Sequence, residues 1–336
     1  MLYIRADMNR IIATGHVMRC LAIADAAEIL GRKTTFILAD DQAEELIKQR
    51  GHKTIILHTE WNNMDTELEQ LKNIIMTYKI HALLVDSYQV TPNYLKMLSE
   101  YTKVAYMDDL NGFLYPVHTL ICYANYWKKF SYEERYQNTH LLLGMSYVPL
   151  RKKYRNCRKK IIKEHIESVL LLSGGTDNFH LLEGFLEVLK KNKYQRINVI
   201  CGVYYFDFEH LCEQYKDYQN INFYQAVSHM EEYMMEADVA VSAGGTTLYE
   251  LCACGTPTIT YSCADNQLNN VLQFQEDGLM AYAGDIRNTN IFKKTEALLK
   301  RLDDSYQLRK ECSEKMQGLV DGNGSIRIAE ELIKFS

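Results

Sequence analysis

The 336-residue sequence predicts an α/β fold made of two Rossmann-like domains, each built on a parallel sheet. Short apolar and β-branched runs alternate with amphipathic helical segments along nearly the whole chain. This alternation is typical of parallel sheets covered on both faces. It pauses once, at residues 151–160, and then resumes, and the length also suits two domains better than one. We therefore expect the two domains to face each other across a cleft, lined by the carboxyl ends of the strands.

The first domain is expected to span residues 1–155. Its predicted strands are LYIRAD, TTFILAD, KTIILH, ALLVDS, KVAYMDD and TLICY. Helices are expected at residues 41–50, 65–78 and 94–101, where apolar residues recur with helical spacing. Strands that alternate with helices in this way predict a doubly wound parallel sheet.

The second domain is expected to span residues 156–318. The basic segment that precedes it, RKKYRNCRKK, is interpreted as a solvated interdomain linker rather than a site for phosphate or nucleic acid. Its predicted strands are SVLLLSGG, INVICG, INFYQA, DVAVSAGG, PTITYS and LMAYAG. A helical tail begins near Asn288, and residues 319–336 are expected to form a last helix that can pack back on the first domain.

The composition narrows the class of protein. Hydrophobic residues make up 47% and the formal net charge is −5, values that favour a globular protein and not a nucleic-acid partner. No apolar run is long enough to cross a bilayer, and the first residues lack the core of a signal peptide. Nine cysteines without paired spacing indicate neither disulfides nor zinc. We expect a cytoplasmic protein without metal or cofactor; its oligomeric state stays open, with a monomer as the expectation.

Two glycine pairs follow strands of the second domain, in LLLSGGTDN and SAGGTTLYELCACGTP. Consecutive glycines let a phosphate approach the backbone amides, and a helix N-terminus adds partial positive charge. A tight turn capped by threonine explains either segment alone about as well. Glu250 lies one turn into the helix expected after SAGGTT, and from there it can reach a pair of sugar hydroxyls. The candidate ligand-binding residues are Gly174, Gly175, Thr176, Gly244, Gly245, Thr246, Thr247 and Glu250.

A third loop of the second domain, SCADNQLNN, is rich in amides. Amide side chains both donate and accept hydrogen bonds, which suits the hydroxyl and acetamido groups of a sugar. Asn266 and Gln267 are therefore candidate sugar ligands. The alternative is a polar loop that caps the following helix.

The first domain offers a histidine at a junction between strand and helix, in ATGHVMRC. The dipole of a helix start favours the neutral imidazole of His16, which leaves a free base. Gly15 lies beside it, and Arg19 follows one turn later, able to meet a carboxylate or phosphate. A lone histidine in a loop can equally be structural.

Acidic residues end two further strands of this domain, in VDSY and MDD. Asp86 ends the first, and the pair Asp108-Asp109 ends the second. Paired carboxylates can hold a proton or a metal, although Asp also caps such loops, and Asp86 and Asp108 are the candidate site residues. Tyr88 is a candidate hydrogen-bonding group for a ligand.

These segments together resemble the nucleotide-sugar hydrolases of pseudaminic acid biosynthesis, from Tyr3 to about Gly284. The motifs that carry the resemblance are RAD, TGHVMRCLAIADA, VDSY, MDD, LLSGGTD, SAGGTTLYELCACGTP and DNQ. Members cleave UDP-2,4-diacetamido-2,4,6-trideoxy-β-L-altropyranose to UDP and the free sugar. Their fold is similar to that of GT-B glycosyltransferases, notably the N-acetylglucosaminyltransferase that makes lipid II. The resemblance thus implies a GT-B fold and a UDP-sugar hydrolase.

By position, the resemblance implies a catalytic histidine at His16, an active-site tyrosine at Tyr88 and a sugar-loop asparagine at Asn266. It also places donor-binding residues at Gly244, Gly245 and Glu250, with Gly174 and Gly175 near the phosphates. One departure is Ala13, which replaces a glycine that is common in the family and would be strained if that position needs a positive φ.

The expected reaction is the attack of water at C1 of the sugar, with inversion and release of UDP. His16 takes the proton, Tyr88 or Asp86 positions the water or the sugar, and the glycine turns stabilise charge on the β-phosphate. One alternative is a GT-B glycosyltransferase, in which an acceptor hydroxyl replaces water. Another is a non-catalytic protein that only binds a nucleotide sugar. The sequence leaves the identity and stereochemistry of the sugar open.

Overall fold

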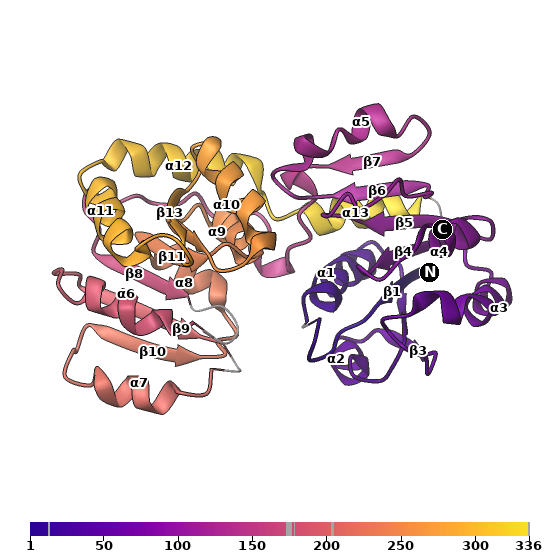
Figure 1. The fold of residues 1–336 in the computed structure, drawn as a ribbon, viewed down its shortest axis with the longest axis horizontal. Helices are drawn as coiled ribbons and strands as arrows, with labels where there is room; N and C mark the ends of the chain where they lie inside the picture. The colour runs from indigo at the N-terminus through magenta and orange to yellow at the C-terminus, as the bar shows by residue number, and fades with distance from the viewer. Residues whose placement is uncertain (13, 173–176, 178, 203–204, 335–336) are drawn as a thin grey trace. The chain divides into compact units, whose positions relative to one another are not determined.

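The chain folds into two compact units. The structure, a computed structural model, describes residues 1–12, 14–172, 177, 179–202 and 205–334. Unit 1 comprises residues 1–155 and 322–336, and unit 2 comprises residues 156–321 (Figure 1). Each unit holds one parallel sheet, which confirms the predicted α/β class with two Rossmann-like sheets.

Unit 1 is built on a seven-stranded sheet with the order β3-β2-β1-β4-β5-β6-β7. The strands are β1 Leu2–Ala6, β2 Thr34–Leu38, β3 Lys53–Ile56, β4 Ala82–Asp86, β5 Lys103–Met107, β6 Thr119–Cys122 and β7 His140–Leu143. The first six occupy the predicted runs. Strand β7, the run HLLL, was not predicted.

Helices cover both faces of this sheet. They are α1 Gly15–Ile29, α2 Glu44–Gln49, α3 Leu68–Tyr78, α4 Pro92–Ser99, α5 Tyr132–Arg135 and α13 Gly324–Ile333, with short 3₁₀ turns η1 Met64–Glu67, η2 Trp127–Phe130, η3 Met145–Tyr147 and η4 Lys152–Tyr154. Helices α1 and α13 pack against each other and lie against β1 and β4. Helices α3 and α4 pack their apolar residues into the core on the other face. The chain sequence β–α–β therefore places every strand's carboxyl end at one edge of the sheet.

Unit 2 is built on a six-stranded sheet with the order β10-β9-β8-β11-β12-β13. The strands are β8 Ser168–Leu172, β9 Arg196–Cys201, β10 Ile221–Gln225, β11 Val239–Ala243, β12 Thr258–Ser262 and β13 Ala281–Asp285, at the six predicted runs. The direction of winding changes between β8 and β11. Loops that follow these two strands therefore lie at the position where open α/β sheets bind ligands.

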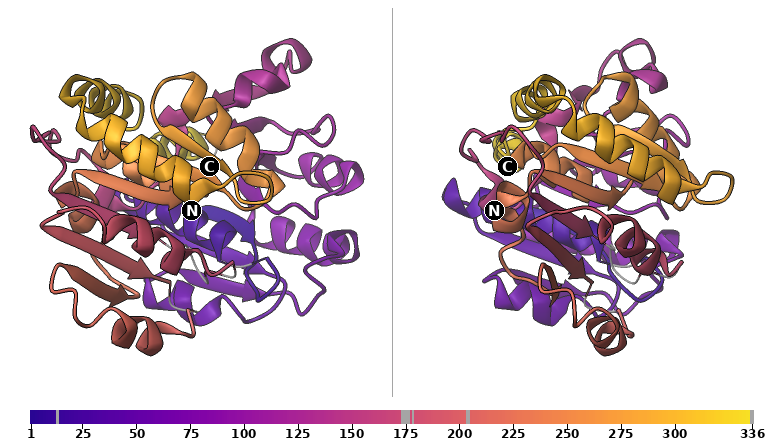
Figure 2. Two further views of the ribbon diagram at one scale, coloured as in Figure 1. Left: turned by 60° about the vertical axis from the view of Figure 1, so that its left-hand side comes forward. Right: turned by 90° about the vertical axis from the view of Figure 1, so that its left-hand side faces the viewer.

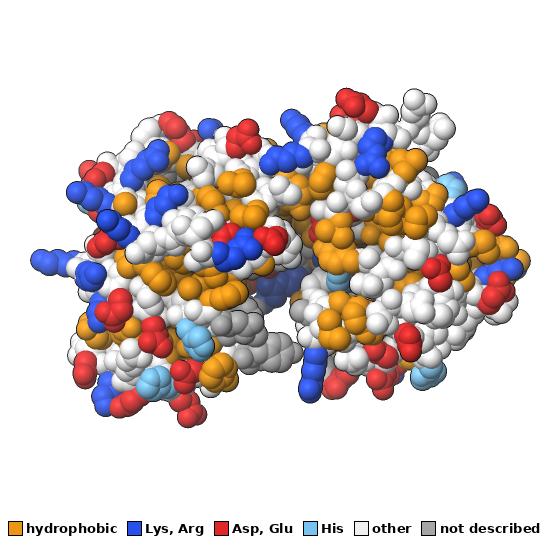
Figure 3. Space-filling view, in the orientation of Figure 1, with side chains coloured by type: hydrophobic (Ala, Val, Ile, Leu, Met, Phe, Trp, Pro, Cys, Tyr) orange, Lys and Arg blue, Asp and Glu red, His pale blue; other side chains and the backbone are white. Residues whose placement is uncertain are grey.

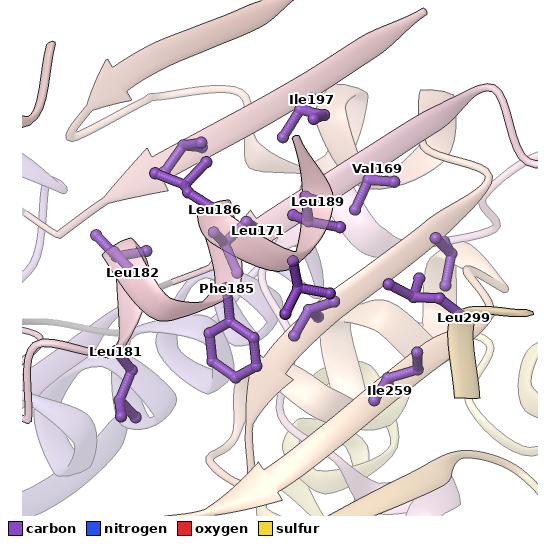
Figure 4. Close-up of a cluster of buried hydrophobic side chains, with 14 of the residues drawn as sticks. Val169, Leu171, Leu181, Leu182, Phe185, Leu186, Leu189, Ile197, Ile259 and Leu299 are labelled. Carbon is purple, nitrogen blue, oxygen red and sulfur yellow. The ribbon is translucent and has the colours of Figure 1, made fainter. Parts of the chain in front are cut away.

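Seven helices flank this sheet (Figure 2). They are α6 Leu181–Leu189, α7 Phe208–Gln214, α8 Met230–Glu236, α9 Thr247–Cys254, α10 Asp265–Glu276, α11 Ile291–Asp303 and α12 Tyr306–Leu319. Helix α6 buries Leu182, Phe185, Leu186 and Leu189 against strand residues such as Val169, in the main core cluster of the unit (Figure 4). These side chains recur every three to four positions, which is why LLEGFLEVL forms a helix with one buried face.

The basic segment is not the wholly solvated linker that we predicted. Lys160 is 6% exposed, and its ammonium group donates to the carbonyls of Met234 (3.0 Å), Met235 (2.5 Å) and Ala237 (2.6 Å). Burial lowers its pKa to about 8. The three carbonyls, at the negative end of α8, stabilise the charged form against that burial. Lys160 is thus a structural cap of α8.

The last helix, α13, belongs to unit 1. Ser325 Oγ donates to the carbonyl of Leu150 at 2.6 Å, deep in the unit. Gly324 lies so close to Val148 that an added Cβ would approach its carbonyl oxygen to 2.2 Å. Gly322 is the residue at which the chain returns from unit 2 to unit 1. It has a φ of +75°, a conformation that glycine adopts readily. Glycine is therefore needed where the chain re-enters unit 1.

The surface is chemically mixed. On the face shown in Figure 3, basic and acidic side chains are interspersed over both units. Among the described residues, no helix is both long enough and apolar enough to span a membrane.

Candidate functional site

The predicted residues of unit 1 gather where β1 and β4 end. His16 lies in the first turn of α1 and is 7% exposed, and Arg19 follows one turn later. Gly15 begins the helix on the exposed side, with no heavy atom within 4 Å of an added Cβ. Asp86 is the last residue of β4 and is fully buried. The sheet therefore brings two helix residues and one strand residue to a common point.

A hydrogen-bonded triad connects these side chains. His16 Nδ1 lies 2.7 Å from Asp86 Oδ1, and Arg19 donates to both Asp86 oxygens, from Nε at 2.6 Å and Nη2 at 2.5 Å. Arg19 Nη2 also lies 3.1 Å from His16 Nδ1. The shorter contact is the one with the ionised carboxylate, which can only accept, so we assign the hydrogen to Nδ1, which donates to Asp86. Among the described residues, His16 Nε2 has no hydrogen-bond partner. The triad thus fixes the imidazole through Nδ1 and leaves Nε2 without a partner among the described residues.

The charge of Asp86 is strongly stabilised. Burial alone would raise the pKa of this carboxyl, but Arg19 and His16 outweigh burial and hold that pKa well below its usual range. Burial would lower the pKa of Arg19, yet Asp86 and Tyr123 raise it, so the guanidinium stays charged. Arg19 Nη1 donates to Tyr123 Oη at 2.8 Å. Asp86 is therefore an ionised group that orients His16 and is not exposed to a ligand.

Tyr88 covers the edge of the imidazole. Its ring lies 4.7 Å from the His16 ring at an interplanar angle of 79°, and the residue is 43% exposed. Its hydroxyl donates to Asp109 Oδ2 at 2.8 Å. Burial and the neighbouring Asp109 raise the pKa of Tyr88 well above its usual value, so the phenol is a neutral donor. Tyr88 can orient a ligand but cannot serve as a base at neutral pH.

Asp108, another predicted ligand residue, has a different environment. It is 3% exposed, and its carboxylate accepts hydrogen bonds from the amides of Leu110 (2.9 Å) and Asn111 (3.1 Å). The hydroxyls of Tyr115 (2.9 Å) and Tyr132 also donate to it. With four donors from its own unit, Asp108 organises the loop after β5. This arrangement favours a structural role over a ligand contact.

Two neighbours complete the surroundings of the triad: Tyr123, which was not predicted, and Asp109, the second acid of the predicted pair in MDD. Asp109 contacts Tyr88, and its Oδ2 lies 3.6 Å from Arg19 Nη1. Tyr123 follows β6 and accepts from Arg19. The signal for Tyr123 was its place at the end of a strand next to β5. No pattern distinguishes Asp109 from the adjacent Asp108, because both end the same strand.

In unit 2, the turn after β11 packs tightly against α10. An added Cβ at Gly244 would lie 2.4 Å from Val271 Cγ1 and 3.1 Å from Gln267 Cβ. At Gly245 the same atom would meet nothing within 4 Å. The first glycine is therefore required for packing, whereas the second leaves open space above the turn. The structure thus brings two predicted segments, around Gly244 and Gln267, together.

Helix α9 starts directly after this turn. Thr246 is its N-cap residue but makes no side-chain capping bond, and Thr247 is its first residue. Within the described part of the chain, neither backbone amide of these threonines donates a hydrogen bond. Both amides are therefore available to an anion at the helix N-terminus. Glu250 lies in the first turn and is half-buried.

The amide-rich loop begins α10. Asn266 is exposed, whereas Gln267 Oε1 accepts from the amide of Cys263 at 2.9 Å and so caps the loop. Asn270, a further amide of the SCADNQLNN segment, donates to the carbonyl of Gly244 at 3.1 Å and accepts from Tyr249 Oη at 2.9 Å. Asn270 thus ties the turn after β11 to both neighbouring helices. Its position one turn after Asn266 was the available signal.

The other turn of unit 2 can be followed only in part. Asp177 accepts from the amides of Leu181 (3.0 Å) and Leu182 (3.1 Å) and so caps the start of α6. Gly174, Gly175 and Thr176 lie outside the described residues, as does Ala13 in unit 1.

A group of metal-ligating side chains occurs elsewhere in unit 2. His229, Glu231 and Glu232 lie at the start of α8, with ligand atoms within 4.8 Å of one another. His229 Nδ1 lies 3.4 Å from Glu231 Oε1, so the group forms ion pairs at the surface. Among the described residues, this is the single cluster of that kind.

Comparison with solved structures defines the class of fold. The chain is similar to the crystal structure of Acinetobacter baumannii MurG, with a TM-score of 0.73 over 99% of both chains at 13% identity. It is also similar to the glycosyltransferase of kitacinnamycin, with a TM-score of 0.70 at 13% identity over 99% of this chain and 98% of that one. The expected GT-B fold, that of many glycosyltransferases, is confirmed. Residues 169–322, nearly all of them in unit 2, match the model of the glycosyltransferase family 28 C-terminal domain.

The chain also has relatives in sequence. The chain is 23% identical over 323 residues to the spore coat polysaccharide biosynthesis protein SpsG of Bacillus subtilis, covering 94% of this chain and 92% of SpsG. It is 30% identical over 185 residues to the UDP-N-acetylglucosamine–N-acetylmuramyl-(pentapeptide) pyrophosphoryl-undecaprenol N-acetylglucosamine transferase of Campylobacter jejuni subsp. doylei, covering 51% of this chain. The uncharacterized protein MJ1062 of Methanocaldococcus jannaschii is 22% identical over 278 residues, 76% of this chain. The matches span only 50% of the transferase and 56% of MJ1062.

Proposed function

We propose that this protein cleaves the bond between sugar and phosphate in a UDP-sugar and transfers the sugar to a hydroxyl group, with His16 as the general base. The observation that carries the proposal is the triad of unit 1, in which Asp86 fixes Nδ1–H and leaves Nε2 of His16 as a free base. A base oriented in this way is what activation of a hydroxyl requires.

Unit 2 supports the donor half of the proposal. Its family 28 domain and the relatives with a named activity point to a nucleotide sugar as the donor. The amides of Thr246 and Thr247, at the start of α9, are suited to a phosphate. Glu250 is proposed to meet the ribose or sugar hydroxyls, and Asn266 the sugar. Gly245 leaves the space that a close-lying phosphate needs.

The proposed reaction is a single displacement. His16 Nε2 takes the proton of the acceptor hydroxyl while its oxygen bonds to C1 of the sugar. The bond from C1 to the phosphate oxygen breaks, and UDP leaves with the electron pair, so the configuration at C1 inverts. Donors at the start of α9 stabilise the charge on the β-phosphate. In this scheme Asp86 orients His16 and does not touch the substrate. Tyr88, beside His16, contacts the reacting groups.

The relatives with a named activity are transferases, so they favour an acceptor hydroxyl over water. Hydrolysis is the second candidate, and one observation favours it. His16 is 7% exposed and is covered by the Tyr88 ring, which suits an acceptor as small as water. In that case the proposed substrate is UDP-2,4-diacetamido-2,4,6-trideoxy-β-L-altropyranose, as the TGHVMRC and VDSY motifs imply.

One experiment separates these outcomes. The protein is incubated with UDP-N-acetylglucosamine or with UDP-diacetamido-trideoxyhexoses, with and without an alcohol acceptor, and products are followed by ¹H and ³¹P NMR. Transfer requires the acceptor for UDP release, whereas hydrolysis releases UDP and free sugar without it. Binding of the nucleotide sugars without any turnover would contradict both enzymatic readings and leave only a binding protein.

The role of His16 has its own test. His16→Ala is expected to lower turnover by at least about 10²-fold, since it removes the base, while UDP-sugar binding stays within a few-fold. His81→Ala, which removes an exposed histidine of the same unit, serves as the control. Turnover by His16→Ala at the wild-type rate would refute the assignment of the base.

A further inference from the structure

The side chains around His16 form a closed ring of contacts that Asp109 completes. From His16, hydrogen bonds lead to Asp86 and on to Arg19. Arg19 Nη1 lies 3.6 Å from Asp109 Oδ2, and the same oxygen accepts from Tyr88 at 2.8 Å. The Tyr88 ring then returns to His16 at 4.7 Å. Asp109 is thus the link between the guanidinium and the phenol.

This ring contains two carboxylates but one guanidinium. Arg19 directs Nε and Nη2 to Asp86 and only the more distant Nη1 toward Asp109. One guanidinium thus pairs with two carboxylates, with its shorter contacts on Asp86 and the longer one on Asp109. While His16 is neutral the ring carries one net negative charge, and proton uptake by His16 brings the ring to neutrality. A nearby negative charge favours the protonated form of an imidazole.

The remaining titratable groups that face this ring are neutral at neutral pH. The Cys20 thiol lies 3.4 Å from Asp86, and burial raises its pKa well above its usual value. Burial raises the pKa of Tyr123 to about 12, and burial also raises that of Tyr88. Neither thiol nor phenols can therefore supply or cancel a charge. The neighbouring Asp108 carboxylate is held by four donors of its own unit, so Asp109 is the second acid in contact with the ring.

The structure holds Asp109 firmly in this unfavourable setting. Its Oδ1 is buried and, among the described residues, lacks a hydrogen-bond partner. Its own carbonyl accepts from Tyr126 Oη at 3.3 Å, and the preceding Asp108 fixes the loop. A buried carboxylate oxygen without a donor is destabilising, so it persists only where the surroundings impose it. Such a group beside a proposed base indicates a functional reason.

We propose that Asp109 is a positioning residue of this site, which orients Tyr88 through its hydroxyl and supplies the unmatched negative charge that favours proton uptake by His16. This inference rests on the proposed function for the role of His16 as a base. The electrostatic effect itself exists with or without turnover, and it can therefore be measured independently.

The test is an NMR titration of the histidine ring signals in four proteins, with His16 assigned through His16→Gln. Asp109→Asn removes the charge but keeps an acceptor for Tyr88. Tyr88→Phe removes the hydrogen bond and keeps the charge. Asp41→Asn removes an equal charge from an exposed loop residue after β2 and is the matched control.

In Asp109→Asn, we expect the midpoint of the His16 titration to fall by about 0.5 to 1.5 pH units, since a close opposite charge is lost. In Asp41→Asn it should move by less than about 0.2 units, because water and salt screen an exposed charge. Tyr88→Phe should lower turnover while the midpoint stays near that of the wild type. If Asp109→Asn fails to fold, Asp109→Ser makes the same charge change.

An unchanged midpoint in Asp109→Asn would overturn the proposal. A shift of equal size in Tyr88→Phe would also overturn it, because the hydrogen bond and not the charge would then be responsible. If the protein turns over UDP-sugars, the acid limb of its kcat/KM profile should move to lower pH in parallel with the NMR midpoint. A shifted midpoint in a protein without turnover would refute the proposed function and leave the role of Asp109 standing.

Discussion

At the scale of single residues, Asp86 determines whether His16 can act. Asp86→Asn should lower turnover by about 10²- to 10⁴-fold, because an amide no longer holds Nδ1–H and the guanidinium of Arg19 loses its charged partner. Steady-state kinetics measure this loss. Cys20→Ala, which removes only the weak thiol contact with Asp86, should keep most of the turnover. Equal losses in both variants would argue for general damage to the core.

The substitution Asp86→Asn should also change how the free energy of unfolding depends on pH. The folded pKa of Asp86 is held below its unfolded value of about 3.9, so the pairing stabilises the fold fully above pH 4 and is lost as the pH falls through the folded pKa. Breaking a buried ion pair costs about 3–5 kcal/mol. Urea unfolding at pH 7 should therefore show that difference between wild type and Asp86→Asn, and the difference should shrink below pH 4.

Site residues could be predicted from the sequence where the residue type is rare at such a position. They could not be predicted where two residues of the same type are adjacent. His16 could be selected because a histidine at a helix start is unusual, and the structure places it beside Asp86. The choice between Asp108 and Asp109 could not be made, since adjacent residues at a strand end point in different directions. Asp108 accepts from Tyr115, whereas Asp109 lies near Arg19. This difference depends on side chains elsewhere in the sequence.

At the scale of elements, the turn between β11 and α9 has two glycines with different duties. Gly244→Ala should destabilise unit 2 by about 1–3 kcal/mol, because its Cβ would lie 2.4 Å from Val271. Gly245→Ala should change stability little, since the position is open, but should weaken UDP binding if a phosphate approaches there. Thermal unfolding and calorimetric titration with UDP measure the two effects. A stable Gly244→Ala variant would contradict the packing role.

The elements themselves followed from the sequence because each strand of a covered parallel sheet is a continuous apolar run. This pattern gave six strands in each unit. It failed for β7, whose run of four residues follows the short helix α5. It also failed for Lys160, because a basic run carries no sign that one member caps a distant helix. Both failures come from tertiary contacts that local patterns do not contain.

At the scale of the whole molecule, unit 1 is discontinuous in sequence. Deletion of residues 322–336 removes α13, which packs on α1 and β4, and should unfold unit 1 while unit 2 survives. Ile328→Ala, at a fully buried position of α13, should lower the stability of unit 1 by about 2–5 kcal/mol. Glu330→Ala, at an exposed position of the same helix, is the control. Limited proteolysis with mass spectrometry identifies the unit that opens, and digestion of unit 2 first would contradict this expectation.

The place of α13 also has a consequence for synthesis on the ribosome. Domains fold as units while the chain emerges, and the segment that completes unit 1 is translated after the whole of unit 2. Unit 2, which is continuous from residue 156 to 321, can therefore finish folding before unit 1 does. A nascent chain of this protein thus exposes the face of α1 that α13 will cover until residues 322–336 have emerged, a period in which chaperones can bind.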